Sequence, residues 1–149
     1  MKSVGRNILA AVLGYVVMFA VSFPLFSLMW LVLGADGSFQ PGSWQVSGAW
    51  AAWSIALGGI VSTAGGFACS KLAVSRQGVA ILIGLVILFA ALAALPDAAT
   101  GVVARPDGAS MFDAMSSAQQ ATWMLWVNPV IGVIGVLLGA TLEGRASLR

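Results

Sequence analysis

The sequence lacks histidine altogether, contains one cysteine and has few charged residues. Only 8% of its 149 residues are charged, whereas about 25% is typical of soluble domains. Because Cys69 is the only cysteine, no disulfide can form within the chain, and without histidine there is no set of Cys and His ligands for a metal. We therefore expect neither a disulfide framework nor a metal or other cofactor.

Hydrophobic residues make up 60% of the chain, and the net charge is only +2. No soluble fold of this size could bury so much apolar surface. The composition predicts an all-α integral membrane protein with a single transmembrane domain, residues 1–149. Its basic residues are dispersed beside apolar segments, so we expect the lipid bilayer, and not nucleic acid, as its partner.

Four apolar segments without a charged residue are long enough to be membrane-spanning helices. The first is nearly twice as long as the apolar core of a signal peptide, which favours a retained span. Together the segments predict a four-transmembrane-helix bundle. The expected spans are 8–34, 50–70, 77–95 and 121–142, with outer loops 35–49 and 96–120 and an inner loop 71–76.

Two prolines, Pro24 and Pro129, fall inside predicted spans. Each removes a helical hydrogen bond and predicts a kink. At Pro24 the kink is either a tolerated feature, with Ser22 or Ser27 helping to satisfy the backbone, or a hinge with a ligand-facing carbonyl. The sequence leaves both interpretations open.

Small residues recur at every fourth position of the second span and form one face of that helix. The fourth span carries a glycine ridge and one amide side chain. These residues are Ser54, Gly58, Ser62, Gly66, Asn128, Gly132, Gly135 and Gly139. Such faces let helix backbones approach closely in lipid, but they could equally line a cavity for a neutral ligand. We expect Asn128 to face inward and to bond to the second span or to the first span near Pro24.

The predicted spans contain no Asp, Glu, Lys, Arg or His. Ion-coupled transporters usually place an ionisable group in the membrane, and intramembrane proteases need metal ligands or a base beside the nucleophile. We therefore expect no enzyme and no catalytic residue. Small multidrug transporters are also four-helix proteins of similar length, but their acidic residue in the first helix has no counterpart here, so that likeness is limited to size.

In the second outer loop, Ser110 and Asp113 have the spacing of a capping box, with Asp in the usual Glu position. This pattern predicts a short helix that begins near Met111. We expect turn and cap roles for Asp97 and Asp107 as well, because the chain offers no histidine as a catalytic partner.

The basic residues concentrate on one side of the predicted topology. Lys2, Arg6, Lys71, Arg76, Arg145 and Arg149 share that side, and Arg105 lies on the other. The positive-inside rule then predicts that both termini are cytoplasmic. The tryptophans lie toward the outer side, where we expect interfacial anchors, with a binding vestibule as the alternative. They are Trp30, Trp44, Trp50, Trp53, Trp123 and Trp126.

The second and fourth spans resemble each other. The shift that places Trp50 on Trp123 also places Trp53 on Trp126 and Ser62 on Gly135. This match predicts two parallel, pseudo-repeated helical hairpins. Chance agreement between common turns and interfacial tryptophans is the alternative.

Two stretches, ADGSFQPGSWQVSGAW at 35–50 and WVNPVIGVIGVLLGA at 126–140, resemble those of small uncharacterised four-span bacterial inner-membrane proteins. The resemblance implies a bacterial inner membrane and no activity. From the residues, we expect a structural or interaction role, in which the Gly/Ser faces pack with a second copy or a partner membrane protein. The alternative is a pore or carrier for a neutral small or lipid-like solute.

Overall fold

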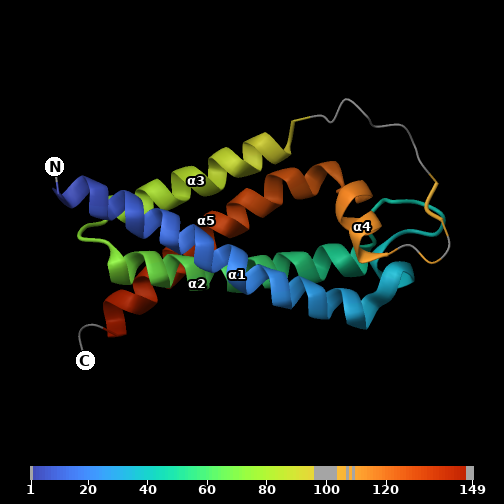
Figure 1. Ribbon diagram of the computed structural model, residues 1–149, viewed down its shortest axis with the longest axis horizontal. Coiled ribbons are helices and arrows are strands. Elements are labelled where there is room, and N and C mark those ends of the chain that lie inside the picture. The colour runs from blue at the N-terminus through green and yellow to red at the C-terminus, as the bar shows by residue number, and fades with distance from the viewer. Residues whose placement is uncertain (1, 96–103, 107, 109, 147–149) are drawn as a thin grey trace.

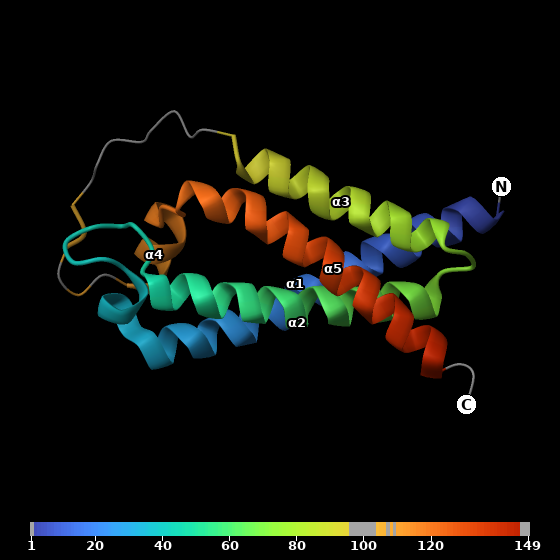
Figure 2. The ribbon, with the colours of Figure 1, turned by 180° about the vertical axis from the view of Figure 1, so that it is seen from behind.

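The computed structural model describes residues 2–95, 104–106, 108 and 110–146. Within this part of the chain, the extended segments form only isolated bridges and the other regular structure is helical, which confirms the all-α fold class. The long helices run along the molecule, and a short helix packs at one end (Figures 1 and 2). The helices are α1 Lys2–Ser38, α2 Gly48–Leu72, α3 Gln77–Ala93, α4 Met111–Ser117 and α5 Thr122–Ala146.

Three helices, α1, α2 and α5, are long and apolar enough to cross a membrane. The chain is therefore a membrane protein. Helix α3 is apolar as well but has only 17 residues, which corresponds to about 26 Å of helix against about 30 Å of hydrocarbon. Helix α4 has 7 residues and lies in the second outer loop of the predicted topology.

Helix α1 is interrupted close to its end. Gly34 has φ 62 and ψ −174, and its positive φ is a conformation in which a side chain would be strained. The end of α1 turns away from the helix axis (Figure 1), so the predicted first loop begins with a helical turn. Near Pro24, where the sequence predicts a kink, Ser22 Oγ donates to the carbonyl of Phe19 at 2.8 Å.

Helices α2 and α5 touch through their backbones. A Cβ atom added to Gly66 would lie 2.6 Å from the Cα of Val136, closer than real Cβ contacts. Gly135 packs against Ser62, and Gly139 fits against the α2 backbone in the same way. Only glycine allows this approach at Gly66, Gly135 and Gly139.

A second close contact joins α1 to α2 in the same part of the molecule. A Cβ atom on Gly14 would lie 2.9 Å from the carbonyl oxygen of Gly65 and 2.8 Å from the Cβ of Cys69. The buried side chains around these two helix contacts form one apolar core. It consists of Ala10, Ala11, Cys69, Val79, Leu82, Val86 and Val136.

Buried Asn7 holds the turn between α2 and α3 against the start of α1. Its Oδ1 accepts hydrogen bonds from the backbone N–H groups of Val74 at 3.0 Å and Ser75 at 3.3 Å. Its Nδ2 donates to Ser75 Oγ at 2.9 Å and to Gln77 Oε1 at 3.4 Å. One side chain that is 1% exposed thus satisfies backbone groups for which the helices provide no partners.

The two halves of the chain differ in the length of their first helix. Helix α1 has 37 residues and α3 has 17. Helix α4 precedes α5, whereas residues 39–47 before α2 form a hairpin turn with a bridge between Phe39 and Val46. The sequence likeness behind the predicted repeat therefore lies in α2 and α5, whereas the segments that precede these two helices differ in structure.

Substituting Gly66 with alanine should destabilise the fold, because the new methyl group would force α2 and α5 apart. We expect a loss of about 1–3 kcal/mol in the free energy of unfolding. Gly58→Ala is the matched control on the same helix, since a Cβ atom at Gly58 meets nothing within 4 Å. Thermal unfolding of detergent-solubilised protein would measure both. Equal melting of the two variants would contradict the glycine contact.

Candidate functional site

A cavity of about 580 Å³ lies in the half of the molecule near α4. We call it the outer cavity. Its walls are formed by α1 between residues 18 and 30, α2 between 50 and 62, and α5 between 124 and 132. Val86 and Ala90 of α3 and residues 111–118 complete it. This volume is in the usual range for small-molecule sites, about 300–1,000 Å³.

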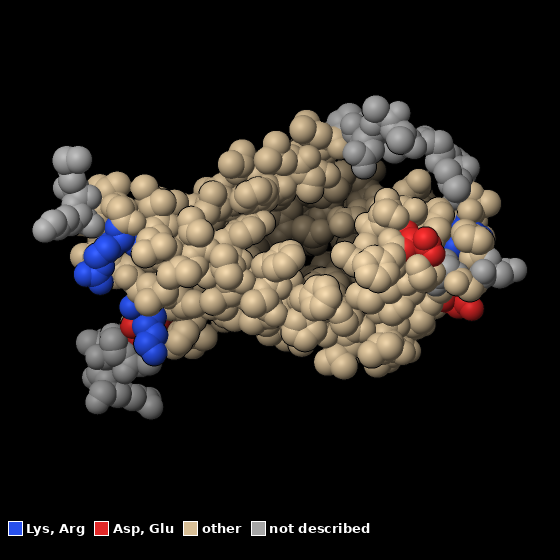
Figure 3. Space-filling model, viewed as in Figure 1, with Lys and Arg blue, Asp and Glu red and all other residues tan. Residues whose placement is uncertain are grey.

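The cavity opens on the side of the helix bundle. Figure 3 shows the hollow between α3 and α1, in the uncharged part of the surface that lies between the charged residues of the two ends. The buried residues of α3 are Gly78, Val79, Leu82 and Val86, all in its first ten residues. The rest of this helix is mostly exposed, although Phe89 still contacts Tyr15 of α1 with ring centroids 4.9 Å apart. The opening therefore faces the region that lipid would occupy if these helices cross a bilayer.

A roof of loop residues and α4 covers the end of the cavity. The hairpin 39–47 and residue Gln119 pair through two hydrogen bonds, from Val46 N to Gln119 O at 3.1 Å and from Gln119 N to Trp44 O at 2.9 Å. Below them lies a second apolar core, which includes Trp44 at 4% exposure. Its buried members are Phe39, Trp44, Val46, Ala51, Ala114 and Met124.

Aromatic rings connect this roof to the wall of the cavity. Phe39 contacts Trp44 edge-on with ring centroids 5.3 Å apart, and Trp30 lies between Phe39 and Trp50 at 6.2 and 6.4 Å. Phe26 reaches Trp50 at 6.1 Å. These spacings and angles are those of favourable aromatic pairs, so the outer wall is a rigid aromatic surface.

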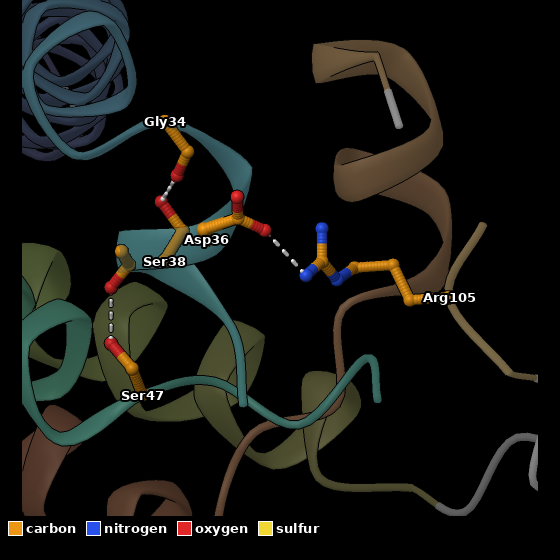
Figure 4. A network of polar contacts seen from close by, with 6 residues as sticks. Gly34, Asp36, Ser38, Ser47 and Arg105 are labelled. Atoms are coloured by element: carbon orange, nitrogen blue, oxygen red, sulfur yellow. Dashed lines mark hydrogen bonds and ion pairs between the residues drawn. The ribbon is translucent and has the colours of Figure 1, made fainter. Parts of the chain in front are cut away.

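Polar contacts hold the roof to the end of α1 (Figure 4). Arg105 Nη2 forms an ion pair with Asp36 Oδ1 at 2.7 Å. Ser47 Oγ donates to the carbonyl of Gly37 and Ser38 Oγ to that of Gly34, both at 2.6 Å. The Arg105 side chain is 8% exposed and that of Asp36 is 94% exposed, so the ion pair is partly screened by water. The bond between Ser38 and Gly34 lies within α1, so the roof is held to α1 chiefly by Ser47, whose backbone N–H also donates to the carbonyl of Ser38 at 2.8 Å.

The capping box predicted from the sequence is confirmed at the start of α4. Ser110 Oγ accepts from the backbone N–H of Asp113 at 3.2 Å, and Asp113 Oδ2 accepts from the backbone N–H of Ser110 at 3.0 Å. The predicted start of the helix at Met111 is also confirmed. This cap matters for the cavity, because Met111, Ala114 and Met115 form part of its wall.

The wall is apolar apart from a few uncharged groups. Ser54 Oγ is buried and has no hydrogen-bond partner within the described residues. Asn128 Nδ2 donates to Gln120 Oε1 at 3.3 Å. Ser22 and Ser62 also line the cavity, but their hydroxyl groups bond to carbonyls of their own helices. No described residue of the wall carries a charge.

The residues of the predicted small faces have two different roles. Ser54, Gly58, Ser62, Asn128 and Gly132 line the outer cavity. By contrast, the contact between α2 and α5 is formed by Gly66, Gly135 and Gly139, with Ser62 at its border. The two interpretations of these faces, packing and cavity, thus apply to successive parts of the same helices.

The bond expected from Asn128 to another transmembrane helix is not present. Asn128 lines the cavity, and its Nδ2 donates to Gln120, which precedes its own helix. Pro129 also lines the cavity. On α1 the lining residues lie between Met18 and Trp30, a segment that contains Pro24.

The tryptophans predicted as interfacial anchors also divide into two sets. Trp30 and Trp50 line the cavity and Trp44 is buried in the roof. The remaining three are exposed on the surface of the helices, as an interfacial anchor requires. They are Trp53 at 55%, Trp123 at 49% and Trp126 at 75% exposure.

Sequence reasoning missed two groups of residues. In the sequence, Asn7 is only a polar residue at the start of an apolar run. Asn side chains are known to bond the backbone N–H groups of turns, but nothing near Asn7 in the sequence indicates which turn it would bond. The roof residues Phe39, Val46 and Met115 were missed because they lie in segments interpreted as loops. Alternating apolar residues in the first outer loop were the available signal for a buried surface there.

Among the described residues, no group of three or more His, Cys, Asp or Glu side chains is placed to hold a metal. Comparison with protein-family models, curated proteins and solved structures finds no match for the chain. The interpretation of the site therefore depends on its own geometry.

Acid should loosen α4. The hydrogen bonds from the Ser110 hydroxyl and the Ser110 backbone hold the pKa of Asp113 below its ordinary value. A lowered pKa in the folded state means that the stabilisation is complete above the ordinary value of 3.8 and is lost as the pH falls through the folded value. Hydrogen exchange of the α4 amides, corrected for intrinsic rates, should therefore show less protection at about pH 3 than at about pH 6.

In Asp113→Asn that difference in protection should largely disappear. Ser116→Ala is the control, because its hydroxyl bonds to carbonyls of the same helix and does not titrate. Equal protection of wild-type α4 at both pH values would contradict a role for the Asp113 carboxylate.

Proposed function

We propose that the protein binds an uncharged, lipid-like molecule in the outer cavity, and that this molecule enters from the membrane. The observation that carries the proposal is a charge-free, largely apolar cavity that opens sideways among membrane-spanning helices. A charged ligand would have to give up its water without receiving an opposite charge. An uncharged chain would find apolar contacts and a few hydrogen-bonding groups.

The cavity favours a binding protein or carrier over an open pore. Beyond Ser62, the space between α2 and α5 is filled by the backbone contacts of Gly66 and Gly139. The inner turn is held by Asn7. A solute could therefore not pass straight through the described structure, and any transport would need these contacts to separate.

The interaction role expected from the Gly/Ser faces is the weaker proposal. Those faces were expected to recruit a second copy or a partner membrane protein. Gly66, Gly135 and Gly139 already have backbone neighbours within the chain, so little of the glycine surface is left for another protein. Nor does the wall of the cavity contain a side chain suited to acid–base chemistry, and we propose no catalytic step.

We further propose that α3 spans the membrane as a fourth helix, in a bacterial inner membrane, with both termini cytoplasmic. Most of the visible Lys and Arg residues lie at the end of the molecule that holds the start of α1 (Figure 3). Glu143 is also at this end, near the end of α5. Asp36 at the end of α1, its partner Arg105 and Asp113 of α4 are at the other end. This distribution supports the orientation. The parallel repeat also stays a proposal, supported by the contact between its matched residues Ser62 and Gly135.

A chain-shaped photoprobe tests the proposed binding. Hexadecane with a mid-chain diazirine should label cavity residues of the protein in membrane vesicles, and excess hexadecane should compete. Gly58→Phe should reduce labelling several-fold, because its ring would occupy the cavity where a Cβ atom meets no neighbour within 4 Å. Gly84→Phe is the matched control, since Gly84 is equally open but lies outside the cavity wall.

Labelling that is equal in both variants, or that maps only to the outer surface of the helices, would refute the binding site. Thermal unfolding of both variants should be measured beside the labelling. It should be similar to that of the wild type, since a Cβ atom at either position meets no neighbour within 4 Å.

Cysteine accessibility tests the orientation. With Cys69 replaced by alanine, a cysteine at Phe112, which is 82% exposed on α4, should react with a membrane-impermeant thiol reagent in intact cells. A cysteine at Ser3, exposed at the start of α1, should react only after the cells are opened. The reverse pattern would show that the termini are outside, and reaction of both in intact cells would contradict the proposed topology.

A further inference from the structure

One hydroxyl group in the cavity wall is left without a partner. Serine and threonine side chains in helices normally bond to a carbonyl one turn back. Ser22, Ser62, Thr63 and Thr141 all do so here, at 2.7 to 2.8 Å. The Ser54 hydroxyl differs from these four: its Oγ is buried and has no partner within the described residues, and the residue is part of the cavity wall.

The second polar group of the wall lies equally far along its own helix. Ser54 is the seventh residue of α2 and Asn128 the seventh of α5, and both helices begin at the roof end (Figure 2). Each residue is therefore about 9 Å along its helix. The hydrogen bond from Asn128 Nδ2 to Gln120 Oε1 leaves the Asn128 Oδ1 acceptor and the Gln120 Nε2 donor for a ligand.

We propose that Ser54, with its hydroxyl rotated from its covered position into the cavity, and the Asn128–Gln120 pair form a polar subsite for the hydroxyl end of a single-chain lipid alcohol. The proposal rests on the proposed function and names its ligand class. A hydroxyl group can donate and accept at once, which suits both the Ser54 hydroxyl and the Asn128 acceptor. A carbonyl group only accepts, so it would leave Asn128 Oδ1 without a donor.

The wall around the subsite excludes larger and charged head groups. Toward the roof, the cavity is closed by Phe39, Val46 and Met115, which are apolar, so a bulky polar head would be buried against hydrocarbon. A carboxylate or phosphate would meet no positive charge in the described wall. Away from the roof, Met18, Val86 and Gly132 leave an apolar space for the chain.

Competition with three matched compounds tests the subsite. Hexadecanol, hexadecane and hexadecanoate share one chain length and should be compared as competitors of the diazirine hexadecane probe, each at its measured membrane concentration. For the wild type, hexadecanol should compete at an about fivefold lower concentration than hexadecane, as expected for one net hydrogen bond. Hexadecanoate should compete least.

Ser54→Ala should remove most of the hexadecanol preference and leave competition by hexadecane unchanged. Ser22→Ala is the matched control: it removes a hydroxyl from the same wall, but one that is already bonded to Phe19. It should retain the preference. The ratio of alcohol to alkane competition within each variant cancels differences in expression and folding.

The outcomes separate the subsite from the function. If hexadecane competes for the probe but hexadecanol is no better, or if Ser54→Ala keeps the preference, the subsite is refuted while the apolar binding site stands. If hexadecanoate competes as well as hexadecanol, the exclusion of charge is refuted. If no compound competes in the wild type, the proposed function itself fails.

Discussion

The backbone contact between α2 and α5 sets the geometry of the whole molecule. In a membrane, no hydrophobic force drives two apolar helices together, so their association depends on close packing and polar bonds. Gly66, Gly135 and Gly139 provide that packing over the half of the helices that is remote from α4. Toward the roof end the two helices diverge (Figures 1 and 2).

The outer cavity is the consequence of this divergence. Gly58 continues the face of Gly66 two turns away, yet a Cβ atom there would meet nothing within 4 Å. The space is closed from above by loop segments, because aromatic residues of the first loop and of α1 stack across it. It is not closed from the side, since α3 contributes buried residues only up to Val86. One tight contact and one short helix thus produce a cavity with a lateral opening.

The sequence predicted what depends on local pattern. Apolar runs located the long helices, the Ser110–Asp113 spacing located α4, and the small residues of α2 located the helix contact. The sequence could not predict where along their length the two helices touch and where they separate. Gly58 and Gly66 have equivalent places in the pattern and differ only in what faces them: Gly66 meets the backbone of Val136, and Gly58 meets nothing within 4 Å. That difference is set by helix crossing, a tertiary property.

The division of the tryptophans has the same origin. All six tryptophans share a preference for membrane interfaces, yet they divide among the cavity wall, the roof and the exposed surface of the helices. The reason is that the loop that contains Trp44 folds back over the helix ends. Asn7 escaped prediction for a related reason: its partners, Val74 and Ser75, lie in a turn far away in sequence. Side chains that satisfy distant backbone groups leave no periodic signal in the chain itself.

These features also decide what can give a bound lipid its affinity. A hydrocarbon chain that moves from the bilayer into an apolar cavity gains almost nothing from the hydrophobic effect, because it was already out of water. The gain must come from better packing and from polar groups that lack partners in the empty site. Interhelical hydrogen bonds in membranes contribute only about 0.6 kcal/mol on average, since competing partners are usually at hand. Ser54 has no such competitor within the described wall. A ligand that satisfies it relieves the cost of a buried, unbonded hydroxyl, about 1–3 kcal/mol, and selectivity in this cavity therefore depends on the polar group and not on the chain.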